Sequence, residues 1–467
     1  MLYHFRPILT AFLQHDGLAF AEVLSEQSVQ QAFADEGVPT NAPIARNTED
    51  ANSTVYTAAV TLWAFLSQVL FKNEQRSCLA ATARVVVLMA SLGRKCSDNT
   101  GAYCRARAKL PTPVIQRLTL QVADGCENRV AEQWLWKGRH VHLVDGTTVS
   151  MPDTAENQAE FPQSRTQQAG LGFPIARLVV LFSLATAMMT GMAMGPYRGK
   201  ETGETALFRE LFGRLKTGEV VLADRYYCSY FMVALLMKLG VDVVARLHQR
   251  RKSHFRQGRD HVVTWQRPAK PEWMTQETYE QMPETIQMRE VHVQIAQPGF
   301  RVGQLIVATT LTDMKAYSKN EIAELYHKRW LVELDIRTLK NTLAIDVLRC
   351  KTPDMVRKEL WACLLAYNLI RQSMLESALE AELSPRQLSF TAALQKAAAS
   401  WMILSVCEGD RAVLLIAVEL EHLAANRVGD RPNRTEPRGN KRRPKAQTYL
   451  TKPRDEARQE LLEGVAA

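Results

Sequence analysis

The stretch from His140 to Leu247 constrains the fold most, because its apolar runs change between strand length and helix length in a regular order. HVHLVD predicts a first strand ending at Asp145, and EVVLAD predicts a fourth strand ending at Asp224. Two strands and a helix are predicted between them, and a helix and a fifth strand after them, which gives the order β-β-β-α-β-α-β. An open α/β sheet places its functional residues where strands end, so these two acids are the first candidate site residues.

A second constraint is the segment YHKRWLVELDIRTLK. At about 100° per residue, four of its polar side chains fall on one stripe of a helix. These are Tyr326, Arg329, Glu333 and Lys340. An apolar face lies beside the stripe and would anchor the helix to a core; it consists of Leu325, Val332, Ile336 and Leu339. The alternative for this stretch alone is an ordinary solvated helix surface with a Glu333–Arg337 ion pair.

Composition limits the class of protein. A chain of 467 residues is too long for one core, and its excess of 58 Lys plus Arg over 49 Asp plus Glu favours a polyanionic partner. The eight cysteines are scattered without metal-site spacing, which predicts free thiols in a reducing, cytoplasmic setting. The start lacks the pattern of a signal peptide, and the uncharged stretch 178–195 is interrupted by polar residues, so we expect two buried strands there and no membrane span.

Helical patterns dominate the two flanks of the predicted sheet. Residues 1–130 form an N-terminal helical region, in which a short helix carrying Arg105 and Arg107 suggests a helix-turn-helix-like DNA reader. A plain helical bundle with solvent-facing arginines remains the alternative. Residues 346–425 form a C-terminal helical region, and 426–467 form a basic, Pro-rich tail that we expect to be disordered without a partner.

Residues 131–345 form the predicted α/β region, which contains a β-rich insertion at about 249–315. The insertion begins with a basic run, and its candidate DNA contacts are Arg250, Arg251 and Lys252. The helix with the polar stripe begins near Ser318, which makes a capping box with Glu321.

Asp145 and Asp224 follow predicted strands, and Glu333 lies on the helix that closes the α/β region. Three acids placed in this way suit phosphodiester chemistry with two divalent cations. The order of elements resembles the ribonuclease-H-like fold of DDE transposases and integrases. The spacing Tyr326-x2-Arg329-x3-Glu333-x6-Lys340 resembles the YREK signature of the bacterial insertion-sequence transposase family numbered four, and LVDGT and VLADR precede it. The resemblance implies a multidomain α/β protein whose ribonuclease-H-like mixed sheet carries the catalytic site.

The resemblance also implies a role for each matching residue. Asp145 would bridge two Mg²⁺ ions, for which Mn²⁺ may substitute, while Asp224 and Glu333 would each hold one. The residues matching those that hold DNA-end phosphates are Tyr326, Arg329 and Lys340. Trp330 matches a tryptophan near a flipped base, and Trp265 and Trp273 are two candidates for a second tryptophan that stacks on that base.

The activity implied is cut-and-paste transposition. A homodimer would pair the terminal inverted repeats, nick each end, form and reopen a hairpin, and join the freed 3′-hydroxyl to target DNA. A first alternative is a catalytically inactive or domesticated DNA-binding derivative. A second is a hydrolase with paired carboxylates, such as a glycosidase, which would not need metal.

Overall fold

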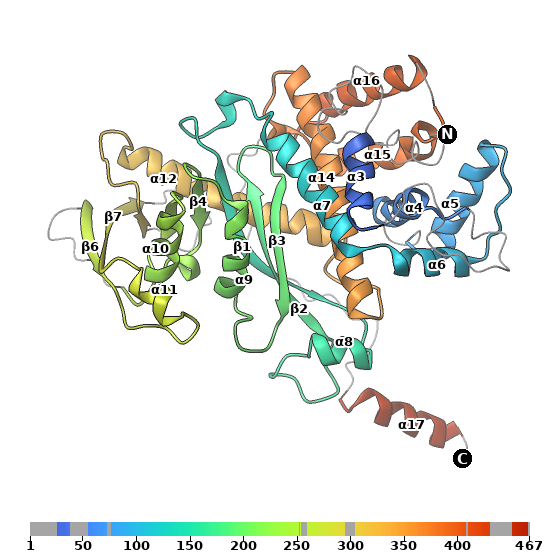
Figure 1. The fold of residues 1–467 in the computed structure, drawn as a ribbon, viewed down its shortest axis with the longest axis horizontal. Coiled ribbons are helices and arrows are strands. Elements are labelled where there is room, and N and C mark those ends of the chain that lie inside the picture. Colours follow the sequence, from blue (N-terminus) through green and yellow to red (C-terminus); the bar gives the residue numbers. More distant parts are fainter. Residues whose placement is uncertain are drawn as a thin grey trace.

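The central sheet and its flanking helices are shown in Figure 1, a computed structural model. The structure describes residues 26–37, 55–71, 76–251, 253, 259–294, 304–407, 410–429 and 451–465. Among the helices in these ranges, none is both long and apolar enough to cross a membrane.

Eight strands form one sheet in the order β3-β2-β1-β4-β5-β8-β7-β6. They are β1 (Val141–Ser150), β2 (Ile175–Ser183), β3 (Met189–Pro196), β4 (Val220–Ala223), β5 (Asp242–Arg246), β6 (Asp260–Gln266), β7 (Thr285–Gln294) and β8 (Gln304–Thr309). β1, β2 and β3 pair antiparallel, whereas β4 and β5 run parallel to β1. This confirms the multidomain α/β fold with a ribonuclease-H-like mixed sheet, and one short helix, α8 (Ala155–Glu160), is added between β1 and β2.

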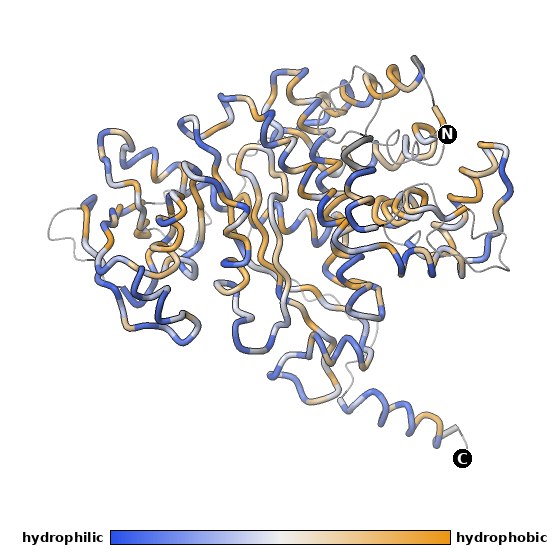
Figure 2. The backbone as a smooth tube through the Cα atoms, viewed as in Figure 1, coloured by the Kyte–Doolittle hydropathy of each residue, from blue (hydrophilic) through white to orange (hydrophobic). Residues whose placement is uncertain are grey.

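Alternating side chains of the central strands enter two different cores, because successive residues of a strand point to opposite faces. Leu178, Val180 and Phe182 pack into the core that contains α7 (Thr112–Glu127) and α14 (Pro353–Glu380). The residues between them in β2 pack into the second core with α9 (Glu204–Glu210) and α10 (Tyr230–Lys238). Figure 2 shows apolar residues gathered on the central strands and their covering helices. The uncharged stretch is therefore two buried strands, as predicted.

The predicted β-rich insertion extends the main sheet. β8 pairs with β5 on one side and with β7 on the other, and β6 lies at the edge. The short helix α11 (Gln276–Glu280) connects β6 to β7. After β8, α12 (Lys319–His327) begins with the predicted capping box, in which Ser318 and Glu321 satisfy each other's backbone N–H groups.

The N-terminal and C-terminal helices share one apolar core, although the sequence assigned them to separate regions. The N-terminal elements are α3 (Glu26–Ala34), α4 (Ala58–Leu70), α5 (Cys78–Ser91) and α6 (Thr100–Lys109), and the C-terminal ones after α14 are α15 (Phe390–Leu404) and α16 (Asp410–Ala425). Trp63 of α4 stacks on Trp401 of α15 at 5.5 Å between ring centroids, and its Nε1 donates to Ser405 Oγ at 2.9 Å. α4 is thereby buried along its whole length.

The prediction of disorder for 426–467 is wrong for the last segment, because 454–465 form helix α17 (Arg454–Val465). Asp455 and Glu456 in its first turn complement the positive end of the helix dipole. Arg454 pairs with Asp153 Oδ2 at 2.5 Å and lies over the Phe173 ring. In Figure 1, α17 lies near α8 at the lower edge of the molecule. The predicted tail residues 430–450 lie outside the described part of the chain.

Asn368 joins three elements and provides a test of this packing. Its Nδ2 donates to the carbonyls of Thr119 and Met189 at 3.0 and 2.9 Å, and its Oδ1 accepts from the Met189 N–H at 3.0 Å. Asn368→Ala leaves buried backbone groups without partners, and we expect it to lower the free energy of unfolding by about 2–4 kcal/mol in denaturant titrations. Asn320→Ala, at an exposed position of α12, should change it by less than about 0.5 kcal/mol. Equal effects would contradict the role of Asn368 as a link between α7, β3 and α14.

Candidate active site

The parallel pairing of β1 and β4 places the two aspartates next to each other. Leu143 lies opposite Leu222, so two residues further along each chain Asp145 lies beside Asp224. Parallel neighbours are about 4.8 Å apart, and both acids share the sheet face of the two leucines. The prediction that the first strand ends at Asp145 is wrong, since β1 continues to Ser150 through its pairing with β2. β4 does end at Ala223, so the pair lies where β1 loses its parallel neighbour.

The backbone fixes one oxygen of each aspartate. Asp145 Oδ1 accepts from the Gly146 N–H at 2.8 Å, and Asp224 Oδ1 accepts from the Arg225 N–H at 2.6 Å. Burial, with smaller contributions from the carboxylates of Glu204 and Asp224, raises the pKa of Asp145 to about 6 against the lowering effect of Gly146 and Arg329. The ionised form of the Asp145 carboxyl is therefore disfavoured when no cation is bound nearby.

Glu204 lies close enough to this pair, from the α9 side of the sheet, for its charge to raise the pKa of Asp145, and the sequence interpretation did not name it as a site residue. It is the first residue of α9, and its Oε2 accepts from the Tyr227 hydroxyl at 3.3 Å. A Cβ on Gly146 would lie 2.4 Å from the Glu204 Cδ, so any larger residue there would displace this carboxylate from its place against β1. The available signal was an acid in the first turn of the helix that follows β3.

The polar stripe lies on a helical segment that is less regular than predicted. Tyr326 ends up buried in α12, Arg329 lies in a 3₁₀ turn over Lys328–Trp330, and Glu333 lies in α13 (Leu331–Arg337). A π-helical turn over Thr338–Thr342 then carries Lys340. The predicted apolar face is confirmed, with Leu325, Val332 and Leu339 buried and Ile336 partly buried. Wide turns of this kind occur often at functional sites.

Arg329 connects the helix to the aspartates. Its Nη2 donates to Glu333 Oε1 at 3.0 Å, and its charge acts on Asp145. Burial raises the pKa of Tyr326 to about 12, with opposing contributions from Arg329 and Asp224. The structure thus brings Asp145, Asp224, Tyr326 and Arg329 to one site, with Glu333 attached through its ion pair.

Lys340 has a separate partner in this structure. Its Nζ lies 2.6 Å from Asp346 Oδ1, and the Asp346 side chain is 57% exposed. The π-helical turn that contains Lys340 interrupts the even stripe predicted for a regular helix.

The carboxylate oxygens of Asp145 and Asp224 are the kind of ligand that hard divalent cations prefer. Two carboxylates lie side by side, and burial together with their like charge raises the pKa of Asp145, an effect that a bound cation would oppose. Within the described ranges, no three acidic, histidine or cysteine side chains stand close enough together to hold one ion. Glu333 would have to exchange Arg329 for the metal before it could act as a third ligand.

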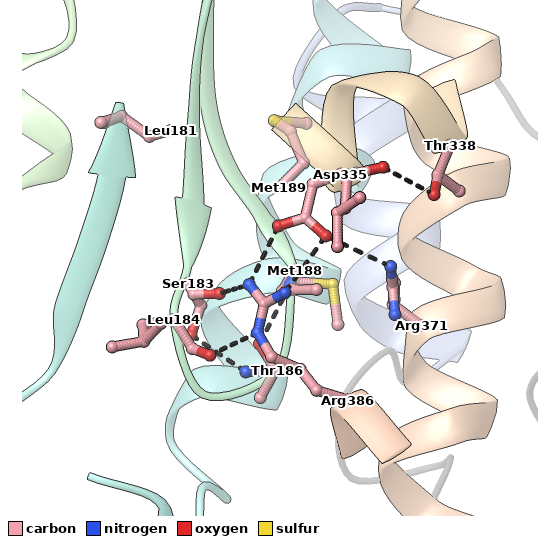
Figure 3. Close-up of polar contacts among 12 residues, drawn as sticks. Leu181, Ser183, Leu184, Thr186, Met188, Met189, Asp335, Thr338, Arg371 and Arg386 are labelled. Carbon is pink, nitrogen blue, oxygen red and sulfur yellow. Dashed lines mark hydrogen bonds and ion pairs between the residues drawn. The ribbon is translucent and has the colours of Figure 1, made fainter. Parts of the chain in front are cut away.

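A buried ion-pair cluster holds α13 in place (Figure 3). Asp335 is 2% exposed, and its two oxygens accept from Arg386 at 2.9 and 3.2 Å. Arg371 approaches the same carboxylate at 3.6 Å. Arg386 also donates to the carbonyls of Ser183 and Leu184, in the turn between β2 and β3. The helix that carries Glu333 is thereby tied to the sheet and to α14.

The candidate contacts in the basic run differ in exposure. Arg250 is exposed, whereas the Arg251 guanidinium lies 3.8 Å from the centre of the Trp265 ring, and Lys252 lies outside the described residues. Trp265 is only 4% exposed and belongs to a core. Trp273 is half-buried, with Arg209 3.8 Å from its ring centre, so the structure exposes more of Trp273 than of Trp265. Trp330 is half-buried beside Arg329.

Of the two arginines predicted on the basic helix α6, one faces inward. Arg105 is exposed. Arg107 donates to Gln68 Oε1 at 3.0 Å and lies over the rings of Phe65 and Tyr103. Arg105 therefore remains a proposed DNA contact.

Comparison with known proteins identifies the family. Residues 136–369 match the family described as Transposase DDE domain, and this match spans half of the chain and includes all three predicted acids. The chain belongs to this family. The matched range also contains the YREK residues, from Tyr326 to Lys340.

Individual relatives agree with this assignment. Transposase InsG for insertion sequence element IS4 of Escherichia coli (strain K12) is 26% identical over 299 residues, which cover 62% of this chain and 64% of InsG. The putative transposase InsL for IS186A of the same strain is 37% identical over 68 residues, 15% of this chain and 18% of InsL. The resemblance to the insertion-sequence family numbered four is thus confirmed, although the chain spans less than two thirds of these relatives.

A solved structure of a piggyBac transposase synaptic complex with hairpin DNA also matches. Its TM-score is 0.44 at 10% sequence identity, and the match covers 90% of this chain and 85% of that chain.

The Asp335 cluster predicts a large loss of stability on truncation. Asp335→Ala leaves the buried Arg371 and the partly buried Arg386 without their counter-ion, and we expect the free energy of unfolding to fall by about 3–5 kcal/mol in denaturant titrations. Glu160→Ala removes an ion pair with Arg357 in which both side chains are about 40% exposed, and should cost less than about 1 kcal/mol. If the two losses were equal, Asp335 would not be the anchor of α13.

The Asp145 carboxyl predicts an unusual pH dependence in metal-free protein. A raised folded-state pKa means that the folded protein binds the proton more tightly than the unfolded chain, so stability falls as pH rises from about 4 to about 6. Asp145→Asn should therefore be more stable than the parent at pH 7, on the order of 2 kcal/mol, and the difference should vanish near pH 3. Chemical denaturation with chelator present measures both values.

Asp313→Asn supplies the control of opposite sign. Hydrogen bonds from the backbone N–H groups of Ala316 and Lys315 lower the pKa of this exposed carboxyl. Its stabilising effect is present above the unfolded pKa and lost as pH falls, so the variant should be the less stable protein at pH 7. A loss of stability at pH 7 in Asp145→Asn would contradict the predicted unfavourable charge at Asp145.

Proposed function

We propose that this protein is the transposase of an insertion sequence, which binds the terminal inverted repeats, cleaves the element ends and joins them to target DNA. The observation that supports it most is the position of Asp145 and Asp224, each two residues beyond the paired Leu143 and Leu222 of β1 and β4, together with the Arg329–Glu333 ion pair. The family match supports the same activity.

The acids would hold divalent cations, with Mg²⁺ as the natural choice and Mn²⁺ as a substitute. Asp145, Asp224 and Glu333 are the residues that would hold them. The ions would supply activation of the attacking oxygen and neutralisation of the leaving oxygen in an in-line displacement at phosphorus. The burial of Asp145 near the carboxylates of Glu204 and Asp224 supports this, because both raise its pKa and a bound cation would favour its ionised form.

The residues around the acids would hold the DNA strand. When Glu333 turns to a metal, Arg329 loses its carboxylate partner and becomes available for a backbone phosphate. The Tyr326 phenol stays neutral because burial raises its pKa to about 12, so it can donate a hydrogen bond to a phosphate oxygen. Lys340 would exchange the exposed Asp346 for another phosphate.

One site would serve each step in turn. Water would attack first and nick the end, and the freed 3′-hydroxyl would attack the opposite strand to make a hairpin. A second water would reopen the hairpin, and the 3′-hydroxyl would finally attack target DNA. In each step Arg329 and Tyr326 would keep the reacting phosphate aligned.

Further cations would bind the DNA beyond the site. Arg250 and Arg105 are exposed, and the basic residues of 426–467 would add backbone contacts that weaken as salt rises. Two copies of the chain would pair the two ends of the element.

An inactive, DNA-binding derivative is the competing proposal. It keeps the phosphate contacts but needs no metal, whereas all three acids and all four YREK residues are present here. A metal-dependent cleavage assay separates the two.

The purified protein should cleave DNA carrying its own element's terminal repeats with Mg²⁺ or Mn²⁺, and chelator should abolish cleavage. Asp224→Ala should lower the cleavage rate at least about 10³-fold with little change in DNA affinity. Glu324→Ala, which removes an exposed carboxylate from α12, is the matched control and should cleave normally. Full cleavage by Asp224→Ala, or binding without cleavage in either metal, would overturn the proposed activity.

A further inference from the structure

A cavity of about 580 Å³ lies between the N-terminal helices and the segment that leads into α14, away from the acids. Its lining includes Cys78 from the start of α5, Cys104 and Arg107 from α6, Gln68 from α4 and Cys350 from the segment before α14. Two thiols from neighbouring helices thus face one space beside a guanidinium.

Cys78 occupies a position that favours the thiolate. It is the first residue of α5, directly after the N-cap Ser77, where the positive end of the helix dipole acts. The Cys104 side chain hydrogen-bonds to it, and the charge of Arg107 adds to this, so that the pKa of Cys78 falls to about 6 despite burial.

Cys104 is the complementary partner. The hydrogen bond to Cys78 and burial raise the pKa of the Cys104 thiol well above its usual value. Near neutral pH the pair therefore consists of one thiolate and one thiol, which is the combination required for a nucleophilic and a resolving cysteine. Both side chains are half-buried, so neither is sealed from small solutes.

We propose that Cys78 and Cys104 form a peroxide-sensitive dithiol, in which Cys78 is the oxidised nucleophile and Cys104 the resolving thiol. The oxidant is a hydroperoxide, with hydrogen peroxide as the simplest case. This site is separate from the acids and holds whether or not the protein cleaves DNA.

The chemistry balances in two steps. The Cys78 thiolate attacks one peroxide oxygen, the O–O bond breaks, and with one proton the products are Cys78 sulfenic acid and water. The Cys104 sulfur then attacks the sulfenic sulfur, the S–O bond breaks, and the thiol proton leaves with hydroxide as a second water. Two electrons pass from the two sulfurs to the peroxide, and one disulfide forms.

The disulfide would act on the contact between the N-terminal helices and the catalytic region. Arg76, two residues before Cys78, donates to the carbonyls of Leu343 and Ala344, directly after the turn that carries Lys340. A crosslink between α5 and α6 would therefore fix the start of α5, next to the contact of Arg76 with Leu343 and Ala344. It would also remove the thiolate charge that faces Arg107.

Peptide mapping of the full-length protein tests the proposal. Reduced protein, freed of reductant and treated with hydrogen peroxide at pH 7, should give a Cys78–Cys104 disulfide as the main product in non-reducing mass spectrometry. In Cys104→Ser the same treatment should leave a sulfenic acid on Cys78 that a dimedone probe traps, and Cys78→Ser should give neither product. Circular dichroism should show that both variants remain folded.

Cys96 is the internal control, because it is also half-buried in the N-terminal helical region but burial raises its pKa. Cys78 should react with peroxide at least about tenfold faster than Cys96. Equal rates, a main disulfide between Cys78 and Cys350, or no disulfide in a folded protein would each overturn the proposal.

Discussion

The ion pair between Asp335 and Arg386 is the interaction on which the arrangement of the candidate site depends. It lies two residues from Glu333 and joins α13 to the turn between β2 and β3 and to the 3₁₀ turn Pro385–Gln387, while Arg371 of α14 approaches the same carboxylate. A buried pair of this kind gives little net stability relative to apolar packing, but it strongly disfavours alternatives in which either partner is left alone. The orientation of α13 on the sheet is therefore specified by charge as well as by the burial of Val332 and Leu339.

The site itself is unfavourable for folding in the absence of a cation. β1 and β4 bring Asp145 beside Asp224, and Glu204 closes in from α9 over Gly146. Burial and like charge raise the pKa of Asp145 to about 6, whereas Arg329 offsets part of the repulsion and holds Glu333. Residues that a fold would otherwise avoid placing together are typical of functional sites, where stability is given up for chemistry.

The sequence predicted the parts of this structure that follow from local patterns. Alternation and strand length gave the order of elements, and the Ser318 capping box gave the start of α12. An acid after each apolar run gave Asp145 and Asp224, although β1 continues past Asp145 to Ser150. These signals are carried by neighbouring residues, which is why they can be seen without a structure.

Features that depend on distant contacts could not be predicted in the same way. The Glu204 carboxylate lies against β1 because Gly146 has no side chain at that point. Arg107 points inward because it contacts Gln68 and Phe65 of another helix. The π-helical turn that contains Lys340 breaks the helical period that the spacing alone predicted to be even. Helix α17 was not predicted because the tail as a whole is basic and Pro-rich, although the first turn of α17 itself is acidic.

We propose above all that Asp145, Asp224 and Glu333 coordinate divalent metal ions beside a DNA strand whose phosphate Arg329 binds. Anomalous diffraction from crystals of the protein with Mn²⁺ and terminal-repeat DNA tests it most directly. The account predicts manganese peaks coordinated by the three acids, with Arg329 released from Glu333 and bound to a phosphate. Manganese absent from Asp145 and Asp224, with the Arg329–Glu333 pair intact beside bound DNA, would contradict it.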